Sequence, residues 1–474
     1  MTKWIVVILI VLMLAAAAAW WLLADRNGRD FPAPSPTTAP SVVPITPRTH
    51  AATGFSTADN AAEAVREALA MARKGLGDKT EGFAFVAATA GYDLETVRDE
   101  LDRLLPPGAK VHGLLSAADV MTEKGYHKGN VGALAILLVS SDSGIRFGAG
   151  AVDGSDSADL ETLGERAMRQ AVADAGVPDS RRPDFVLYAG VQSGGGERKI
   201  LDGIAKVVGK NVPVLGGNVG LAPSQPPSPF TRDALHPNGL VLTALYTDRT
   251  IGWALEYGFR ATETTGKVTK ASPAGDVIYE IDDRAALDVY NEWLNGKLLP
   301  IVENEPLETV IGYTACNPVG YALKAPRGAE GEIIVTVIPT RKNLQDRALP
   351  VYAEVPEGTT IRLLAGRWQT LLNRAEQAVV KALLRGTNRA GNIEFGLFNF
   401  CWAASRAIPP SELPKLPLLV RNQIPHTPFL GLFTKGQQGP LPGVRNIHCN
   451  LAAAMLLVEQ EDEGKTRKEP KSVR

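Results

Sequence analysis

The stretch from Val212 to Leu245 organises the rest of the sequence. It begins Val212-Pro-Val-Leu-Gly-Gly-Asn-Val219 and, after a passage rich in Ser and Pro, continues Pro237-Asn-Gly-Leu-Val-Leu-Thr-Ala-Leu245. The first apolar run is stopped by a glycine pair, which is typical of a buried strand. A Pro-Asn-Gly turn introduces the second run, which indicates another buried strand. Strands that are apolar throughout need cover on both faces, so this stretch predicts a layered structure around it.

The segments on either side alternate between helical and strand patterns. Before the opening stretch, apolar spacing predicts helices at 59–73, 94–104, 160–175 and 196–208, and strands at 82–88, 110–115, 131–139 and 184–189. After it, the same reading predicts strands at 251–259, 277–281, 332–338, 359–364, 393–400, 427–434 and 446–458, with helices at 284–294 and 369–384. The fold class is therefore α/β or α+β. We expect two mixed domains in tandem, at 57–248 and 249–460, and the sequence has no repeat of solenoid period.

The N-terminus predicts a membrane anchor. Trp4 to Ala24 is a run of 21 residues without a charge, long enough to cross a hydrocarbon core of about 30 Å. A cleaved signal peptide is the alternative, but the run exceeds the usual apolar length of about 7–15 residues. We expect a single-pass transmembrane helix within 1–25, with the membrane side of the soluble region left open. A proline-rich linker follows at 26–56, and the charged segment 461–474 is expected to be disordered.

Composition excludes some classes of function. The net charge is −1, so no basic field indicates a nucleic-acid partner. The three cysteines, Cys316, Cys401 and Cys449, show no CxxC spacing. Neither a disulfide framework nor a zinc site is expected from them.

Several motifs, taken in order, resemble those of the FIST family, with its N-terminal and C-terminal domains in tandem. In the first half they are Val111-His-Gly-Leu-Leu-Ser-Ala-Ala-Asp119 and the two runs of the opening stretch. In the second half they are Val277-Ile-Tyr-Glu-Ile-Asp-Asp-Arg-Ala-Ala-Leu287, Val355-Pro-Glu-Gly358 and Phe400-Cys-Trp-Ala-Ala-Ser-Arg406. The resemblance covers about residues 60–460 and rests on the order and spacing of these motifs.

The resemblance implies a sensory protein that binds a small ligand, an amino acid or a related metabolite. Family members are often fused to kinases, cyclases or methyl-accepting regions. The short segment after Gln460 leads us to expect that the signal passes to a separate, unknown partner protein. The implied ligand residues are Arg406, Gln437 and Asn450, and the Arg406 guanidinium suits a carboxylate. Gln437 stands where the family usually has an acid.

Alternatives remain open at this point. No cofactor or metal is expected, but haem has been proposed for part of the family, and His448 would be its ligand here. An enzyme acting on a small metabolite in the cleft between the two domains is a second alternative, although no nucleophile, base and orienting acid cluster in the sequence. A structural or assembly role at the membrane is a third.

Overall fold

The computed structural model describes residues 50–154, 159–178, 180–191, 196–222, 225–323, 332–386, 390–441 and 445–460. The chain divides into two compact units, residues 1–48 and 49–474, and every described helix and strand belongs to the second unit. The predicted anchor at 4–24, most of the predicted linker and the segment 461–474 lie outside the described residues. Within the described ranges, no helix combines the length and the apolar character needed to cross a membrane.

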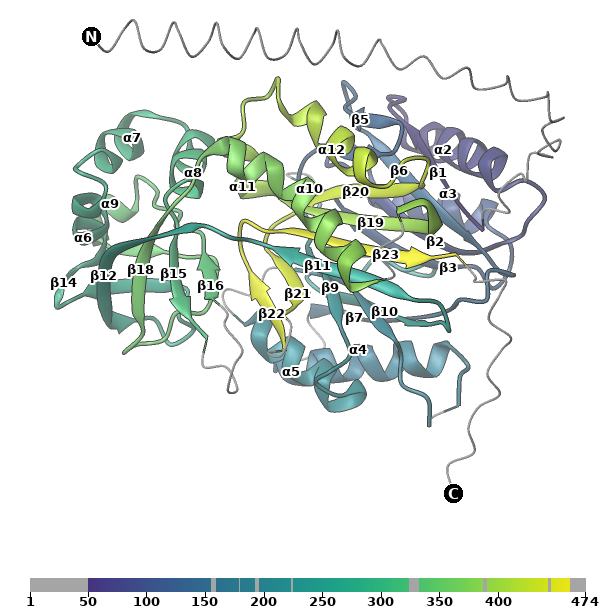
Figure 1. Cartoon of the computed structure of the whole chain (residues 1–474), viewed down its shortest axis with the longest axis horizontal. Helices are drawn as coiled ribbons and strands as arrows, with labels where there is room; N and C mark the ends of the chain where they lie inside the picture. Colours follow the sequence, from purple (N-terminus) through teal and green to yellow (C-terminus); the bar gives the residue numbers. More distant parts are fainter. Residues whose placement is uncertain are drawn as a thin grey trace, which may run out of the picture. The chain divides into compact units, whose positions relative to one another are not determined.

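One arrangement of strands and helices occurs three times in the second unit (Figure 1). The first repeat consists of β1 (Ala51–Ser56), α2 (Ala61–Leu76), β2 (Glu81–Ala88), α3 (Leu94–Leu104), β3 (Lys110–Leu115) and β6 (Leu134–Ser140). The second consists of β7 (Arg146–Val152), α4 (Leu160–Asp174), β8 (Phe185–Gly190), α5 (Glu197–Val208), β9 (Val214–Asn218) and β10 (Leu240–Tyr246). The third consists of β11 (Ile251–Glu256), α10 (Trp368–Arg385), β19 (Ile393–Cys401), α11 (Trp402–Ala407), α12 (Leu416–Gln423), β20 (Phe429–Thr434) and β23 (Ala453–Glu459).

Strand pairing is the same in each repeat. The sheet orders β1-β6-β2-β3, β7-β10-β8-β9 and β11-β23-β19-β20 all place the last strand between the first and the second. The last strand is antiparallel to both neighbours, and the second and third strands are parallel. A parallel pair needs a crossover connection, which α3, α5 and the α11–α12 segment provide. The three repeats are therefore one topology used three times.

In each repeat, a segment after the third strand pairs with a strand of another repeat, and these pairings close the three repeats into a ring. After β3 the chain forms β4 (Val120–Thr122), which pairs with β20, and β5 (Gly125–His127). After β9 it bridges back to β3 through Phe230 and Gly113. After β20 it forms β21 (Gln437–Pro440), which pairs with β9, and β22 (Asn446–Cys449). Residues from both sides of position 249 thus share sheets.

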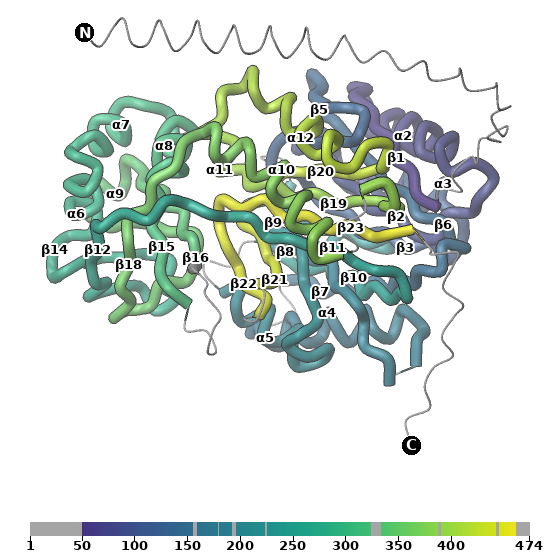
Figure 2. The backbone as a smooth tube through the Cα atoms, in the orientation of Figure 1, coloured from purple at the N-terminus to yellow at the C-terminus, as the bar shows by residue number. Residues whose placement is uncertain are grey.

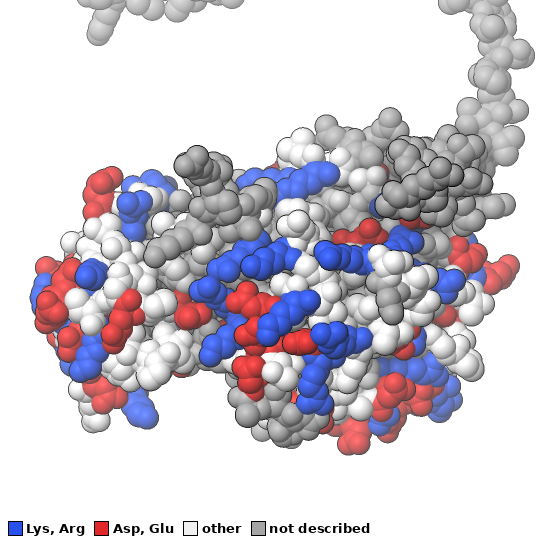
Figure 3. Space-filling model, turned by 90° about the horizontal axis from the view of Figure 1, so that it is seen from below, with Lys and Arg blue, Asp and Glu red and all other residues white. Residues whose placement is uncertain are grey.

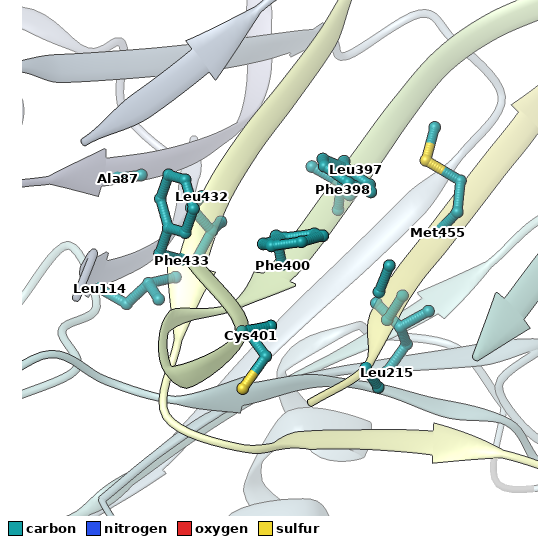
Figure 4. Packing of buried hydrophobic residues seen from close by; sticks show 14 of the residues in the cluster. Ala87, Leu114, Leu215, Leu397, Phe398, Phe400, Cys401, Leu432, Phe433 and Met455 are labelled. Carbon is teal, nitrogen blue, oxygen red and sulfur yellow. The ribbon is translucent and has the colours of Figure 1, made fainter. Parts of the chain in front are cut away.

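Three backbone hydrogen bonds mark the centre of this ring. The Ala117 N–H donates to the carbonyl oxygen of Phe433 at 2.8 Å. The Gly220 N–H donates to the carbonyl oxygen of Leu115 at 2.7 Å, and the Lys435 N–H donates to that of Asn218 at 2.9 Å. The core lies around this centre, where apolar side chains from all three sheets meet (Figure 4). Phe400 and Phe433, for example, pack edge to face with 6.0 Å between their ring centroids.

Both faces of the β8 strand are buried, as its continuous apolar sequence predicts. Phe185, Leu187 and Ala189 face the large core shared by the repeats. Val186 and Tyr188 face a second cluster formed with α4 and α5. The side chains of a strand alternate between its faces, so one apolar run serves two cores.

Residues 257–367 form a module inserted into the third repeat, between β11 and α10 (Figure 2). Its sheet has the order β14-β13-β12-β18-β15-β16, with β17 paired to β13. The strands are β12 (Arg260–Ala271), β13 (Val277–Ile281), β14 (Arg284–Ala285), β15 (Val319–Ala322), β16 (Glu332–Val335), β17 (Leu349–Pro350) and β18 (Thr360–Ala365). The helices are α6 (Ala286–Trp293), α7 (Leu298–Asn304), α8 (Leu307–Ala315) and α9 (Asn343–Asp346).

A fully buried arginine fastens this module to the ring. The Arg374 side chain on α10 donates to the carbonyl of Gly258, at 2.7 Å, and to that of Leu451. Its guanidinium carbon lies 4.2 Å from the centroid of the Phe259 ring. Burial lowers the pKa of Arg374 to about 10. Arg374 therefore holds together the start of the inserted module and the loop between β22 and β23.

The structure also departs from the predicted elements. Residues 51–56, inside the range expected to be linker, form β1 and pair with β6. The predicted helix at 284–294 begins as the short strand β14, and the predicted strand at 446–458 is broken into β22 and β23 by Leu451, whose φ is 56°. Strands β7, β12 and β21 were not predicted. Acidic and basic side chains are interspersed over the face seen in Figure 3, without a field of one sign.

Candidate functional site

A cleft of about 980 Å³ lies between the second repeat and the inserted module. Helix α5 and strand β22 form one wall, and β15, β16 and the segment 353–360 form the other. Leu201, Ala322, Ile333 and Ile447 are among its apolar lining residues. Its charged lining residues are Glu197, Arg198, Asp202, Lys210, Glu354, Glu357 and Arg445. A concave, largely apolar site with a few charged groups is the usual form of a small-ligand pocket.

One of the residues that line the cleft is a buried acid. Glu197 is the first residue of α5 and is 2% exposed. Asn218, the last residue of β9, donates from its Nδ2 to Glu197 Oε1 at 2.9 Å. A carboxylate in the first turn of a helix interacts favourably with the helix dipole. The acid is therefore held in place by the carboxyl end of β9 and the amino end of α5, both in the second repeat.

Buried amides connect this acid to His448 on β22, in the same wall of the cleft. Gln438 Nε2 lies 3.3 Å from Asn218 Oδ1 and 3.0 Å from His448 Nδ1. An amide nitrogen carries two hydrogens, so it donates to both atoms. The His448 Nδ1 is then an acceptor, its Nε2 carries the proton, and that nitrogen donates to the Tyr352 carbonyl at 3.3 Å. The hydrogen-bonded series Glu197–Asn218–Gln438–His448 thus reaches the Tyr352 carbonyl of the inserted module.

Close backbone approach makes this network possible. A Cβ on Gly216 would lie 1.8 Å from the Tyr188 carbonyl oxygen, so only glycine fits beside β8 at this point. The Tyr188 hydroxyl is buried near Asn218 Oδ1, at 3.5 Å. Burial, and then the charge of Glu197, raises the pKa of Tyr188. Tyr188 is therefore neutral and acts as a hydrogen-bond donor behind the cleft.

The predicted ligand residues occupy different places. Gln437 is completely buried; its Nε2 donates to Thr434 Oγ1 at 2.9 Å, and its Oε1 accepts from the Ala452 N–H at 3.1 Å. Asn450 donates from Nδ2 to the Tyr352 carbonyl at 2.7 Å, the same carbonyl that His448 contacts. Gln437 and Asn450 thus hold backbone behind the cleft and are not among its lining residues.

Arg406 shares no contact with Gln437 or Asn450 among the described residues. It is on α11, where its Nη2 donates to Ser405 Oγ at 3.3 Å and its guanidinium lies over the Trp402 ring. Of the candidate ligand residues Arg406, Gln437, Asn450 and His448, only His448 lines the cleft. Both of its ring nitrogens lie within hydrogen-bond distance of protein atoms. This arrangement does not fit an axial haem ligand, which needs one ring nitrogen for iron.

Sequence reasoning missed Glu197, Asn218 and Gln438. They are far apart in the chain and belong to α5, β9 and β21, so no local spacing connects them. No sequence signal marked Gln438, because the strand that contains it, β21, was not predicted. Among the residues that the structure describes, no group of three or more His, Cys, Asp or Glu side chains could hold a metal ion.

Comparison with known proteins identifies the family. The FIST N domain model matches residues 82–284, and the FIST C domain model matches residues 286–440. The search of curated proteins found no match. FIST domains are generally sensory domains that bind small ligands.

Likeness to solved structures is slight. A cyanuric acid hydrolase from A. caulinodans is 14% identical with a TM-score of 0.25, over 48% of this chain and 81% of the hydrolase. Phosphoribosylformylglycinamidine synthase II from Thermotoga maritima is 11% identical with a TM-score of 0.18, over 86% of this chain and 72% of the synthase. Likenesses at these TM-scores carry no argument about the chain. The two family matches, in contrast, show that the chain belongs to the FIST family, with a FIST N domain followed directly by a FIST C domain.

Proposed function

We propose that this chain is a sensory protein that binds an amino acid or a related metabolite in the cleft between α5, β22 and the inserted module. The observation that carries the proposal is a 980 Å³ cleft whose lining includes the buried Glu197 carboxylate and the guanidinium groups of Arg198 and Arg445. We further propose that the apolar run 4–24 tethers the chain to a membrane and that a separate protein receives the signal.

The chemistry of the lining supports this ligand class. Glu197 offers a carboxylate for an ammonium group, in a site where burial strengthens the interaction. Arg198 and Arg445 also line the cleft. The positive charges of both lower the pKa of the Tyr321 hydroxyl, against the larger effect of its burial, so both lie within electrostatic range of that residue. A guanidinium is suited to a ligand carboxylate. Acid and guanidinium groups in one cleft thus match the two charged ends of an amino acid, and the apolar wall accommodates a side chain.

The connections of the inserted module support a sensory response. The module joins the ring by two short segments, 257–259 and 366–367. A ligand that contacts α5 on one wall and residues 353–360 on the other would bind the closed arrangement more tightly than an open one. A ligand shifts an equilibrium only by such a difference in affinity. The contact from His448 to the Tyr352 carbonyl would strengthen or weaken with closure, and the amide network would carry that change toward the centre of the ring.

The experiment is a thermal-shift screen of the purified full-length chain against the proteinogenic amino acids and their deaminated 2-oxo acids, followed by calorimetry. A ligand that binds only the folded chain raises its stability. Glu197→Gln should weaken an amino acid at least about 10-fold, because a charged hydrogen bond contributes about 1.5–3 kcal/mol, and should affect the matching 2-oxo acid much less.

A blocking variant makes the location testable. Ala322 is exposed and lines the cleft, so Ala322→Trp should abolish ligand binding. Ala70 is exposed on α2, and Ala70→Trp serves as the matched control that leaves binding unchanged. Binding that survives Ala322→Trp would place the ligand elsewhere. A ligand whose mass changes during incubation would instead support the enzyme alternative.

A further inference from the structure

Two cationic side chains share one indole ring on the third repeat. The Arg406 guanidinium carbon lies 5.5 Å from the centroid of the Trp402 ring, and Lys435 Nζ lies 5.1 Å from it. All three residues are partly exposed. Like charges gathered at one ring repel each other, so the ring alone does not account for the pair.

Neither cation has an anionic partner among the described residues. Arg406 makes one side-chain hydrogen bond, to Ser405 Oγ, and its Nε is buried without an acceptor. Burial lowers the pKa of Lys435, which means that its ammonium group has lost part of its hydration. An unpaired, partly desolvated charge is costly to a fold. Two of them side by side therefore indicate a site for a negatively charged group.

The position of Trp402 and Lys435 in the fold also supports an anion site. Cys401 and Thr434 are the last register pair of the parallel strands β19 and β20, and Trp402 and Lys435 come directly after them. In the second repeat the equivalent parallel pair ends at Gly190 and Asn218, and Asn218 holds the acid of the cleft. Ligands of α/β sheets bind outside the carboxyl ends of the strands. The pair thus lies where the repeat topology places a ligand.

We propose that Arg406 and Lys435 bind the oxyanion, a carboxylate or a phosphate group, of a small ligand at a site separate from the cleft. The Nη atoms of the Arg406 guanidinium donate to an oxygen of the ligand, and the lysine adds a point charge. Arg406 and Asp119 both act electrostatically on the Tyr126 hydroxyl, which donates to Asp119 Oδ2 at 2.8 Å, although Asp119 forms no ion pair with Arg406 in the described structure. The negative charge of Asp119 disfavours a phosphate dianion, so a singly charged carboxylate is the preferred ligand.

The test measures binding of acetate, succinate and inorganic phosphate to the full-length chain by calorimetry and thermal shift, at ionic strength fixed with sodium chloride. Arg406→Gln and Lys435→Gln should each weaken binding at least about 10-fold, and Lys435→Arg should keep it within about threefold, because the charge remains. Arg385 is the matched control, since it lies 4.0 Å over Trp253 but donates to that residue's carbonyl. Arg385→Gln should leave binding unchanged.

Stability separates this role from a structural one. Without an oxyanion, Arg406→Gln and Lys435→Gln should be as stable as the wild type or more so, because each removes an unpaired charge. Ala322→Trp should leave oxyanion binding intact even though it blocks the cleft. The proposal is overturned if no oxyanion binds more tightly than chloride, or if Arg385→Gln weakens binding as much as Arg406→Gln. Tighter binding of phosphate than of the carboxylates would keep the site and reverse its specificity.

Discussion

His112 makes the stability of the fold sensitive to mild acid. It lies on β3, is completely buried, and its Nδ1 is 2.9 Å from Thr243 Oγ1 on β10. Its ring stacks on Phe85, and its Nε2 has no partner inside the described structure. Burial lowers the pKa of His112 to about 3. The residue therefore joins the first repeat to the second through a ring that must stay neutral.

The size of the effect follows from linkage between proton binding and folding. The pKa in the unfolded chain is about 6.5, so the unfolded chain takes up a proton in mild acid and the folded chain does not. Stability contributed by the neutral ring is complete above pH 6.5 and is lost as the pH falls toward 3. Between pH 7 and pH 5 the loss is about 2 kcal/mol for this residue alone. A folded pKa of about 4 instead of 3 changes this figure by less than about 0.1 kcal/mol.

The substitution is His112→Asn, which keeps a polar atom near Thr243 and removes the titration. Urea unfolding at pH 7 and pH 5 measures the free energy at each pH. The variant will be less stable than the wild type at pH 7, because it loses ring packing. Its loss between pH 7 and pH 5, however, should be about 2 kcal/mol smaller than that of the wild type. His127, whose pKa burial also lowers, supplies part of the remaining loss.

An exposed histidine gives the control. His426 is solvent-exposed with a φ of 65°, a conformation that asparagine tolerates. His426→Asn therefore replaces a histidine without removing buried packing, and the pH dependence of His112→Asn is compared with that of this variant. Equal losses between pH 7 and pH 5 in the wild type and in His112→Asn would refute the reasoning, since the buried ring would then not be the group that resists protonation.

Three further predictions concern the fold and the predicted anchor. Arg249 Nη1 lies 3.1 Å from Glu394 Oε2, with side chains 5% and 1% exposed; Arg249→Met should cost about 3–5 kcal/mol in urea unfolding, and Arg249→Met with Glu394→Leu should recover most of it. A Cβ on Gly436, whose φ is 78°, would lie 2.4 Å from His448 Cε1; Gly436→Ala should cost about 1–3 kcal/mol, seen as a lower Tm. The full-length chain should sediment with membranes and resist high-salt extraction through residues 4–24; recovery in the soluble fraction with Met1 intact would contradict this.

Local patterns in the sequence were sufficient for the elements that are apolar and compact. The runs around Val214 and Leu240 are the buried strands β9 and β10, and both faces of the sheet are covered. Helix α3 begins at the Asp93 cap, whose side chain accepts from the Thr96 N–H. These features depend on neighbours in the chain, so propensity, capping and periodicity can report them.

Strand β7 was not predicted, because close packing against α4 requires glycines in the strand and these interrupt its apolar pattern. Its sequence, Arg-Phe-Gly-Ala-Gly-Ala-Val, contains two glycines, which weaken a strand pattern. A Cβ on Gly148 or Gly150 would lie 2.1 Å from the carbonyl oxygen of Ala171 or Ala167. The glycines are thus required by a helix that comes later in the chain, and nothing local to the strand indicates that need.

The candidate sites divide in the same way. From the sequence alone, Arg406 and His448 were candidate ligand-binding residues, and the order of the motifs indicated the FIST family. The sequence could not pair Arg406 with Lys435, because these residues meet only through the parallel pairing of β19 with β20. It could not connect His448 and Gln438 to Asn218, because β21 pairs with β9 from a distant part of the chain.

The sequence by itself determined the α/β class, the main strands and helices, and the family, since these rest on short-range periodicity and on the order of motifs. Only the tertiary structure decided that the chain is a ring of three equivalent repeats with a module inserted into the third. The physical reason is that the ring is closed by pairing between strands more than two hundred residues apart, such as β4 with β20 and β21 with β9. Backbone hydrogen bonds of this kind place no demand on side-chain identity, so they leave no repeated pattern in the sequence. The cleft exists because that closure brings the inserted module against α5.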